Sequence, residues 1–192
     1  MELWLPRSVQ VQSFEAACTD MVRYRTRVLY QAFQQLRLFI MHSLPYFFSE
    51  RIAEHSVFSL SDDTAHHIIQ VLRMKKEEHI LLTDGKGTKA EAVIVEADKK
   101  NCSVHIKNIL HEEPASKKIC IGISILKNAS RFEWFLEKAT EIGVTEIIPL
   151  LCSRTERQHF RYDRMHQIIV SAMLQSQQSY LPVLHQPTDF KT

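Results

Sequence analysis

Glycine is scarce in this sequence, where it accounts for only four of 192 residues. None of the four lies in a GxGxxG or Walker pattern after a predicted strand. Such loops need glycine because the backbone must approach a phosphate closely, so conventional dinucleotide and phosphate-loop sites are not expected. No serine lies in a GxSxG turn, and no histidines or cysteines have zinc-ligand spacing. Basic and polar side chains are left to carry any chemistry, and no metal is predicted.

Long apolar runs and a strong charge of one sign are also lacking. The formal net charge is +2, so any surface for a polyanion must arise from local clustering of bases. No window approaches the roughly 18 to 20 apolar residues of a membrane span. The run LRLFIM at 36–41 is interrupted by Arg37. Neither export nor membrane insertion is predicted.

Cysteine usage indicates a reducing compartment. The four cysteines are far apart in the sequence and form no CxxC pair. Three of them lie inside apolar, strand-like runs, where we expect them to be buried: Cys102, Cys120 and Cys152. We therefore predict free thiols in a cytoplasmic protein, and no cysteine that acts as a nucleophile.

Amino-acid composition and the pattern of apolar residues divide the chain into four segments. Residues 1–43 mix arginines with apolar residues and glutamines, which predicts an extension that is poorly ordered or helical at about 21–40. Residues 44–112 contain short strands typical of a small β-barrel, with a glycine-containing hairpin turn at 84–87. Residues 113–118 read as a linker. Residues 119–192 contain a strand, a helix and a strand in close succession, which predicts an α/β domain with parallel strands.

A short helix is predicted at 62–74 within the barrel segment. Ser61 or Asp62 is suited to cap its start. The spacing of its apolar residues predicts a buried side formed by Ala65, Ile68, Ile69 and Leu72. Its polar residues His66, His67 and Arg73 then lie elsewhere on the helix.

The α/β segment opens with the apolar run KICIGISIL at 118–126, which we interpret as a strand covered on both faces. Ser130 and Glu133 have the spacing of a capping box at the start of the next helix, and Gly143 has the position of a left-handed residue after its end. Trp134 is interpreted as a packing residue. A second strand at 144–151, a helix at 162–178 and a short strand in LPVL complete the segment.

Basic residues follow both strands of the α/β segment. Lys127 comes after the first strand and Arg154 after the second. Because the carboxyl ends of parallel strands meet at one edge, where ligands of such sheets bind, we expect these two side chains to lie close together. Guanidinium groups suit phosphates and base edges. For Arg157 and Arg161, a solvated loop and helix start is the favoured interpretation.

Four stretches together resemble the RsmE family of ribosomal RNA uracil-N3 methyltransferases. They are HHIIQVLRMKKEE, LLTDGKGTKAEAVI, KNASRFEWFLEKATEIGVTEIIPLLCSRTE and RMHQIIVSAMLQSQQSYLP. The resemblance runs from about Leu44 to the last residue. It implies a PUA-like RNA-binding barrel followed by a SPOUT-type α/β domain, acting as a homodimer. The implied reaction moves a methyl group from S-adenosylmethionine to N3 of a uracil in 16S rRNA.

The resemblance also implies roles for single residues. Arg154 matches the family arginine after the second strand and is the predicted catalytic residue, because a cation there stabilises the uracil anion formed when N3 loses its proton. The lysines beside the barrel hairpin and helix suit an RNA backbone. The residues predicted to contact RNA are Lys127, Arg73, Lys75, Lys86, His67 and Arg164.

The sequence departs from the family pattern at three places. Ser153 stands where an acidic residue is common, and Gln178 where many members have arginine. The glycine-rich loops that hold the methyl donor in the family have no counterpart before Thr192. Donor-binding residues therefore stay unassigned, and residues 119–192 are predicted to be the first part of a SPOUT domain without its knot.

Two classes of function follow from these observations. The first is a methyltransferase that uses S-adenosylmethionine, which predicts binding of the donor. The alternative is a non-catalytic RNA-binding module, or an inactive fragment of such an enzyme. The RNA-binding module predicts RNA affinity that falls steeply with salt, without donor binding. An inactive fragment predicts a broad melt with exposed apolar surface.

Overall fold

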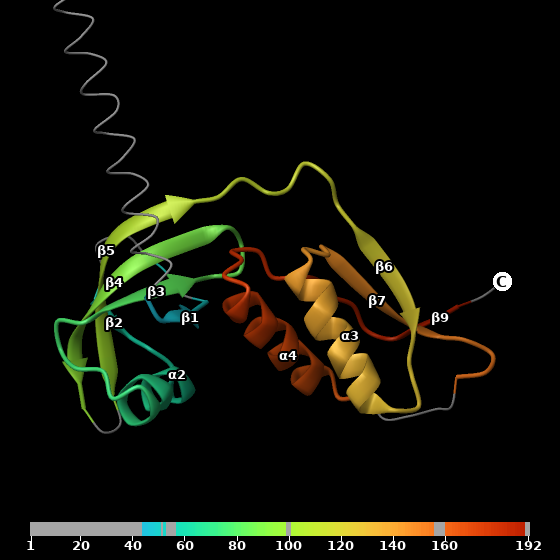
Figure 1. Ribbon diagram of the computed structural model, residues 1–192, viewed down its shortest axis with the longest axis horizontal. Helices are drawn as coiled ribbons and strands as arrows, with labels where there is room; N and C mark the ends of the chain where they lie inside the picture. The colour runs from blue at the N-terminus through green and yellow to red at the C-terminus, as the bar shows by residue number, and fades with distance from the viewer. Residues whose placement is uncertain (1–43, 51, 53–56, 99–100, 156–159, 191–192) are drawn as a thin grey trace, which may run out of the picture. The chain divides into compact units, whose positions relative to one another are not determined.

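Two β-sheets organise the chain in this computed structural model (Figure 1). The structure describes residues 44–190 except 51, 53–56, 99–100 and 156–159. The helix predicted at about 21–40 lies outside the described residues. Among those that are described, no helix is long and apolar enough to cross a membrane.

The first sheet has five strands in the order β1-β3-β4-β5-β2. β1 and β3 are parallel, and the other neighbours are antiparallel. Side chains that alternate along the central strands build the core, including Ile80, Leu82, Ile94 and Val104, which are fully buried. The strands are β1 (Tyr46–Phe48), β2 (Val57–Ser59), β3 (His79–Thr83), β4 (Thr88–Ala97) and β5 (Cys102–His111).

The predicted hairpin turn joins β3 to β4. Gly85 has a φ of 71° and Gly87 a φ of 97°, values that other residues adopt only with strain. The carboxylate of Asp84 closes the turn, because its Oδ1 accepts hydrogen bonds from the backbone N–H of Lys86 at 2.7 Å and of Thr88 at 3.1 Å. The prediction of a glycine-dependent hairpin is confirmed.

The barrel helix differs from its prediction in the second half. α2 (Asp62–His66) continues as a π-helix, η1 (His67–Val71), and Ala65 and Ile68 are buried as expected. Leu72 is 43% exposed, so its predicted burial is wrong. A π-helix holds more residues per turn than an α-helix, which turns Leu72 away from the buried face. Ser61 occupies the N-cap position, but its side chain makes no capping hydrogen bond.

The second sheet is built from parallel strands, as the strand–helix–strand pattern predicted. Its order is β6-β7-β8, with β9 also paired to β7. α3 and α4 lie side by side against it (Figure 1). The elements are β6 (Cys120–Ser124), α3 (Ala129–Glu141), β7 (Glu146–Leu151), α4 (Tyr162–Gln175), β8 (Val183–Leu184) and β9 (Thr188–Asp189).

β6 is not covered on both faces, contrary to the prediction. No residue of this strand is buried, and among the described strands it pairs only with β7, so it forms an edge of the sheet. The expectation that the three cysteines are buried is wrong for two of them. Cys120 in β6 is exposed and Cys152 is half-buried, whereas Cys102 in the barrel core is buried.

The start of α3 also differs from its prediction. Asn128 is the N-cap residue, and its Oδ1 accepts a hydrogen bond from the backbone N–H of Ser130 at 3.0 Å. The capping box at Ser130 is therefore wrong, since the helix begins earlier. Trp134 is 63% exposed and does not pack as expected. Gly143, with a φ of 84°, has the left-handed conformation predicted after the helix.

Candidate functional site

The two basic residues predicted at strand ends follow β6 and β7 at the same edge of the sheet. Ser124 and Leu150 are paired at the ends of the two strands. Lys127 follows β6, Arg154 follows β7, and both residues are exposed. They therefore project from neighbouring strand ends, as the sequence predicted for parallel strands.

A hydroxyl network holds the turn that carries Arg154. The backbone N–H of Thr155 donates to the carbonyl of Cys152, and the N–H of Cys152 donates to Oγ1 of Thr155, both at 2.9 Å. Oγ1 of Thr155 also lies 2.9 Å from Oγ of Ser124 at the end of β6. These contacts tie the turn after β7 to the neighbouring strand. Sequence reasoning assigned no role to either hydroxyl, although hydroxyls at two adjacent strand ends were a signal.

Arg164 is engaged in an ion pair between the two helices. Its Nε and Nη2 donate to the two carboxylate oxygens of Glu133 at 2.6 and 2.9 Å. This hydrogen bonding holds the pKa of Glu133 below its ordinary value. Any contact of Arg164 with RNA must therefore use its remaining N–H groups or compete with Glu133. A second ion pair on α3 joins Lys138 to Glu141 at 2.9 Å.

Three exposed bases lie close together on the barrel, after η1: Arg73, Lys75 and Lys76. They make no ion pair with any residue that the structure describes. Arg73 has a φ of 56° and Glu77 a φ of 73°, so this turn holds a strained backbone. Strain of this kind is often found where side chains must be held for binding. His67 is exposed, and its ring lies edge-on to Phe47 with 5.8 Å between centroids.

Lys86 lies where the barrel meets the second sheet. Its backbone forms an antiparallel β-bridge with Tyr180, and the residue is exposed. The N–H of Leu181 donates to the carbonyl of Gly85 at 2.8 Å. Tyr180 and Leu181 directly precede β8, whose first residue pairs with the first residue of β7. The barrel is therefore attached at the amino-terminal ends of these strands, and the structure does not bring its bases to the edge of Arg154.

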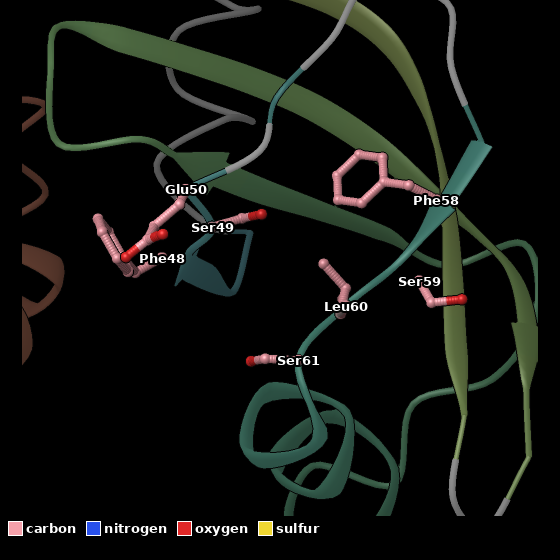
Figure 2. Close-up of a pocket in the computed structure, with 7 residues that line it drawn as sticks. All are labelled: Phe48, Ser49, Glu50, Phe58, Ser59, Leu60 and Ser61. Atoms are coloured by element: carbon pink, nitrogen blue, oxygen red, sulfur yellow. The ribbon is translucent and has the colours of Figure 1, made fainter.

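Two cavities in the described part of the chain lie away from Arg154. One, of about 400 Å³, lies between β1 and β2 and is lined by Phe48, Ser49, Glu50, Phe58, Ser59, Leu60 and Ser61 (Figure 2). It offers a carboxylate but no base. The other, of about 580 Å³, is mainly apolar and is lined by residues from 112–118, 143–146 and 177–183. Among the described residues, no three metal-ligating side chains gather to hold an ion.

Comparison with known proteins gives the family of the chain. Residues 112–192 match the RNA methyltransferase domain family, and residues 60–107 match the RNA methyltransferase PUA domain family. Most of residues 60–192 is therefore similar to two domain families of RNA methyltransferases. The resemblance to RsmE proteins is confirmed, and so is the fold class, a PUA-like β region followed by a SPOUT-type sheet of parallel strands.

Curated relatives carry the name Ribosomal RNA small subunit methyltransferase E. One from Rickettsia conorii is 27% identical over 139 residues, which cover 72% of this chain and 57% of the relative. One from Bacillus subtilis is 32% identical over 109 residues, or 55% of this chain and 41% of the relative. The chain thus spans about half the length of the curated relatives it matches.

Solved structures of the family agree with the fold. A probable rRNA-methyltransferase from Porphyromonas gingivalis is 37% identical, with a TM-score of 0.70 over 76% of this chain and 61% of that one. A Ribosomal RNA small subunit methyltransferase E from Neisseria gonorrhoeae, bound to S-adenosyl methionine, is 27% identical. Its TM-score is 0.63 over 76% of this chain and 62% of the other.

Proposed function

We propose that this chain takes part in methyl transfer from S-adenosylmethionine to N3 of a uracil in 16S ribosomal RNA. The observation that carries the proposal is the position of Arg154 in a turn that Thr155 and Ser124 fix at a strand edge, within the region similar to the RNA methyltransferase domain. The names of the relatives and the donor bound in the Neisseria protein support the substrate and cofactor.

Arg154 has the chemistry that this reaction needs from the protein. N3 of uracil becomes a good nucleophile only when its proton leaves, and the negative charge then spreads onto the two neighbouring carbonyl oxygens. A fixed guanidinium stabilises that charge by directed hydrogen bonds. When bound, S-adenosylmethionine supplies an electrophilic methyl carbon. We assign no donor-binding residue, because neither of the two cavities described above opens at this edge.

RNA recognition is the second part of the proposal. Lys127 beside Arg154 faces the substrate at the strand edge, and Arg164 contributes the N–H groups that Glu133 leaves unused. On the barrel, Arg73 and Lys75 contact the phosphate backbone from the strained turn. His67 and Lys86 extend this contact along the barrel surface.

We further propose a homodimer, and a cytoplasmic location where ribosomal RNA is found. Trp134 and Ile142 support self-association, because they are 63% and 75% exposed on or just after α3. An interaction surface needs a contiguous apolar patch, and the homodimer would require these two side chains to contribute to one. The division into 44–112, 113–118 and 119–192 also stays a proposal, supported by the end of β5 at His111 and the start of β6 at Cys120.

A titration of the purified chain with S-adenosylmethionine, run beside an RNA-binding assay at several salt concentrations, tests the main proposal. Binding of both ligands supports a methyltransferase. RNA binding that weakens with salt, without donor binding, supports the alternative of a non-catalytic RNA-binding module. Binding of neither, with a broad melt, indicates an inactive fragment.

Arg154→Ala isolates the proposed catalytic residue. In a family protein carrying the same segment and able to methylate, we expect turnover to fall by about a hundredfold or more, in the range of a lost transition-state donor. Donor binding should be unchanged. Arg161→Ala is the matched control, since this exposed arginine starts α4. Equal turnover in the two variants would remove Arg154 from the mechanism.

A further inference from the structure

Glu112 stands where β5 ends, and it contacts both halves of the described chain. Its backbone N–H donates to the carbonyl of Gly87 at 2.8 Å, and its Oε1 accepts from Nζ of Lys89 at 2.7 Å. Its Oε2 accepts from the hydroxyl of Ser179 at 2.5 Å, and its carbonyl accepts from the hydroxyl of Tyr180 at 2.7 Å. Each polar group of this one residue therefore joins the barrel or the segment before β8.

The surroundings of Glu112 suit a fixed junction. Ser179 is 2% exposed and the side chain of Lys89 is 16% exposed, whereas the side chain of Glu112 itself is 47% exposed, so the contact with Ser179 is the more shielded of the two. The hydroxyl of Tyr46 donates to the carbonyl of Gln178 at 3.1 Å, and burial raises the pKa of Tyr46 to about 12, which keeps the hydroxyl a donor. Shielded hydrogen bonds to charged groups are stronger than exposed ones.

We infer that Glu112 is a positioning residue, which holds the RNA-binding barrel at a fixed spacing from the strand edge that carries Arg154. This inference rests on the proposed function. The barrel joins the amino-terminal ends of β7 and β8, whereas Arg154 follows the carboxyl end of β7. The junction and the turn of Arg154 thus lie at opposite ends of β7, about 20 Å apart for six residues. A held spacing raises the effective concentration of one surface for an RNA strand already bound to the other.

The test compares two single-stranded RNAs rich in uridine. One has about 8 nucleotides, within the length that a single small barrel covers, and the other about 25. In the wild-type chain we expect the long RNA to bind at least tenfold more tightly, because its second contact is intramolecular. Glu112→Ala removes the side-chain contacts with Lys89 and Ser179, and it should lower this ratio and leave the affinity of the short RNA unchanged. Glu113→Ala, which removes the neighbouring exposed carboxylate, should keep the ratio.

Two further experiments distinguish a positioning role of Glu112 from a loss of folding: a double variant with the two charges swapped, and amide hydrogen exchange. Lys89→Glu combined with Glu112→Lys re-forms the ion pair and should restore much of the ratio, whereas each single change should lower it. Two backbone N–H groups donate hydrogen bonds across the junction: that of Gly87 to the carbonyl of Ser179, and that of Leu181 to the carbonyl of Gly85. They should lose protection in Glu112→Ala, while amides in the middle of β4 keep it.

Each result then has one meaning. A lowered ratio with rescue by the charge exchange supports the inference. A ratio that persists in Glu112→Ala, or a wild-type ratio near one, overturns the inference and leaves the proposed function intact. Failure of the wild-type chain to bind either RNA overturns the proposed function, and the positioning role falls with it.

Discussion

The two sheets of this chain build their cores differently. In the barrel, the fully buried large side chains come mainly from strands, among them Ile80, Leu82 and Ile94. In the second region, Ile147 is the strand residue of this kind among those described, and the others come from the helices: Phe132, Leu136, Ile169 and Met173. The barrel is therefore held together by its strands, whereas the second sheet depends on α3 and α4 to cover it.

This difference explains where the candidate site lies. A strand that supplies no buried side chains, such as β6, leaves its end free to carry exposed polar groups. The hydroxyl of Ser124 at the end of β6 lies 2.9 Å from that of Thr155 after β7, and this contact fixes the turn that carries Arg154. In the barrel, the exposed bases lie instead on the strained turn after η1, outside the strands that form the core.

Matched truncations in the two cores should have the largest effect on stability. Ile94→Ala and Ile147→Ala each remove a fully buried side chain, and each should lower the free energy of unfolding by about 2–5 kcal/mol. Ile142→Ala, at a position that is 75% exposed, should change it by less than about 0.5 kcal/mol. Chemical denaturation measures all three.

The shape of the transition sharpens this comparison. Because Glu112 and the hairpin join the halves, both core variants should shift one common transition. Separate transitions, each moved by only one of the two variants, would mean that the barrel and the second region unfold independently.

Two glycines with similar backbone angles provide the next comparison. Gly143→Ala should cost about 1–2 kcal/mol, because its φ is 84° but nothing lies within 4 Å of the added Cβ. Gly87→Ala should cost more, since its φ is 97° and the Cβ would overlap the hydroxyl of Tyr180. Melting and denaturation curves of the two variants measure the difference. Equal costs would indicate that Tyr180 moves aside and that the junction is loose.

The sequence predicted elements whose signals are local. Gly85 and Gly87 flank a two-strand pattern, and only glycine takes up their backbone angles without strain, so the hairpin was predictable. The parallel pairing of β6 with β7 was predictable from the strand–helix–strand order. The placement of Lys127 and Arg154 at one edge followed from that pairing.

Features that depend on distant contacts were not predictable. Leu72 fits the α-helical spacing of a buried side, but the change to a π-helix turns it outward. Trp134 is exposed because Phe132 and Leu136 fill the core beside it, and composition alone does not distinguish the three. The links of Glu112 to Ser179 and Tyr180 span 67 and 68 residues, so only the folded chain reveals them.

A smaller effect is expected from the hydroxyl that fixes the turn of Arg154. Thr155→Val removes the acceptor of the Cys152 N–H and the contact with Ser124, and should cost about 1 kcal/mol. Thr155→Ser keeps the hydroxyl and is the matched control. Hydrogen exchange at the amide of Cys152 should speed up in the valine variant alone. Faster exchange in the serine variant alone would instead show that the methyl group, not the hydroxyl, holds the turn.

The smallest effect should come from the pair of Glu133 and Arg164, and it should depend on pH. Arg164 holds the pKa of Glu133 below its ordinary value in the folded chain, so the carboxylate stabilises the fold above the pKa of the unfolded state. That contribution is lost as the pH falls through the lowered pKa. Wild type should therefore melt slightly above Glu133→Gln at pH 7, and the gap should close below pH 4.5. A gap that stays constant through this range would mean that the pair adds no stability through the charge of Glu133, and Arg164 would then be available to contact RNA.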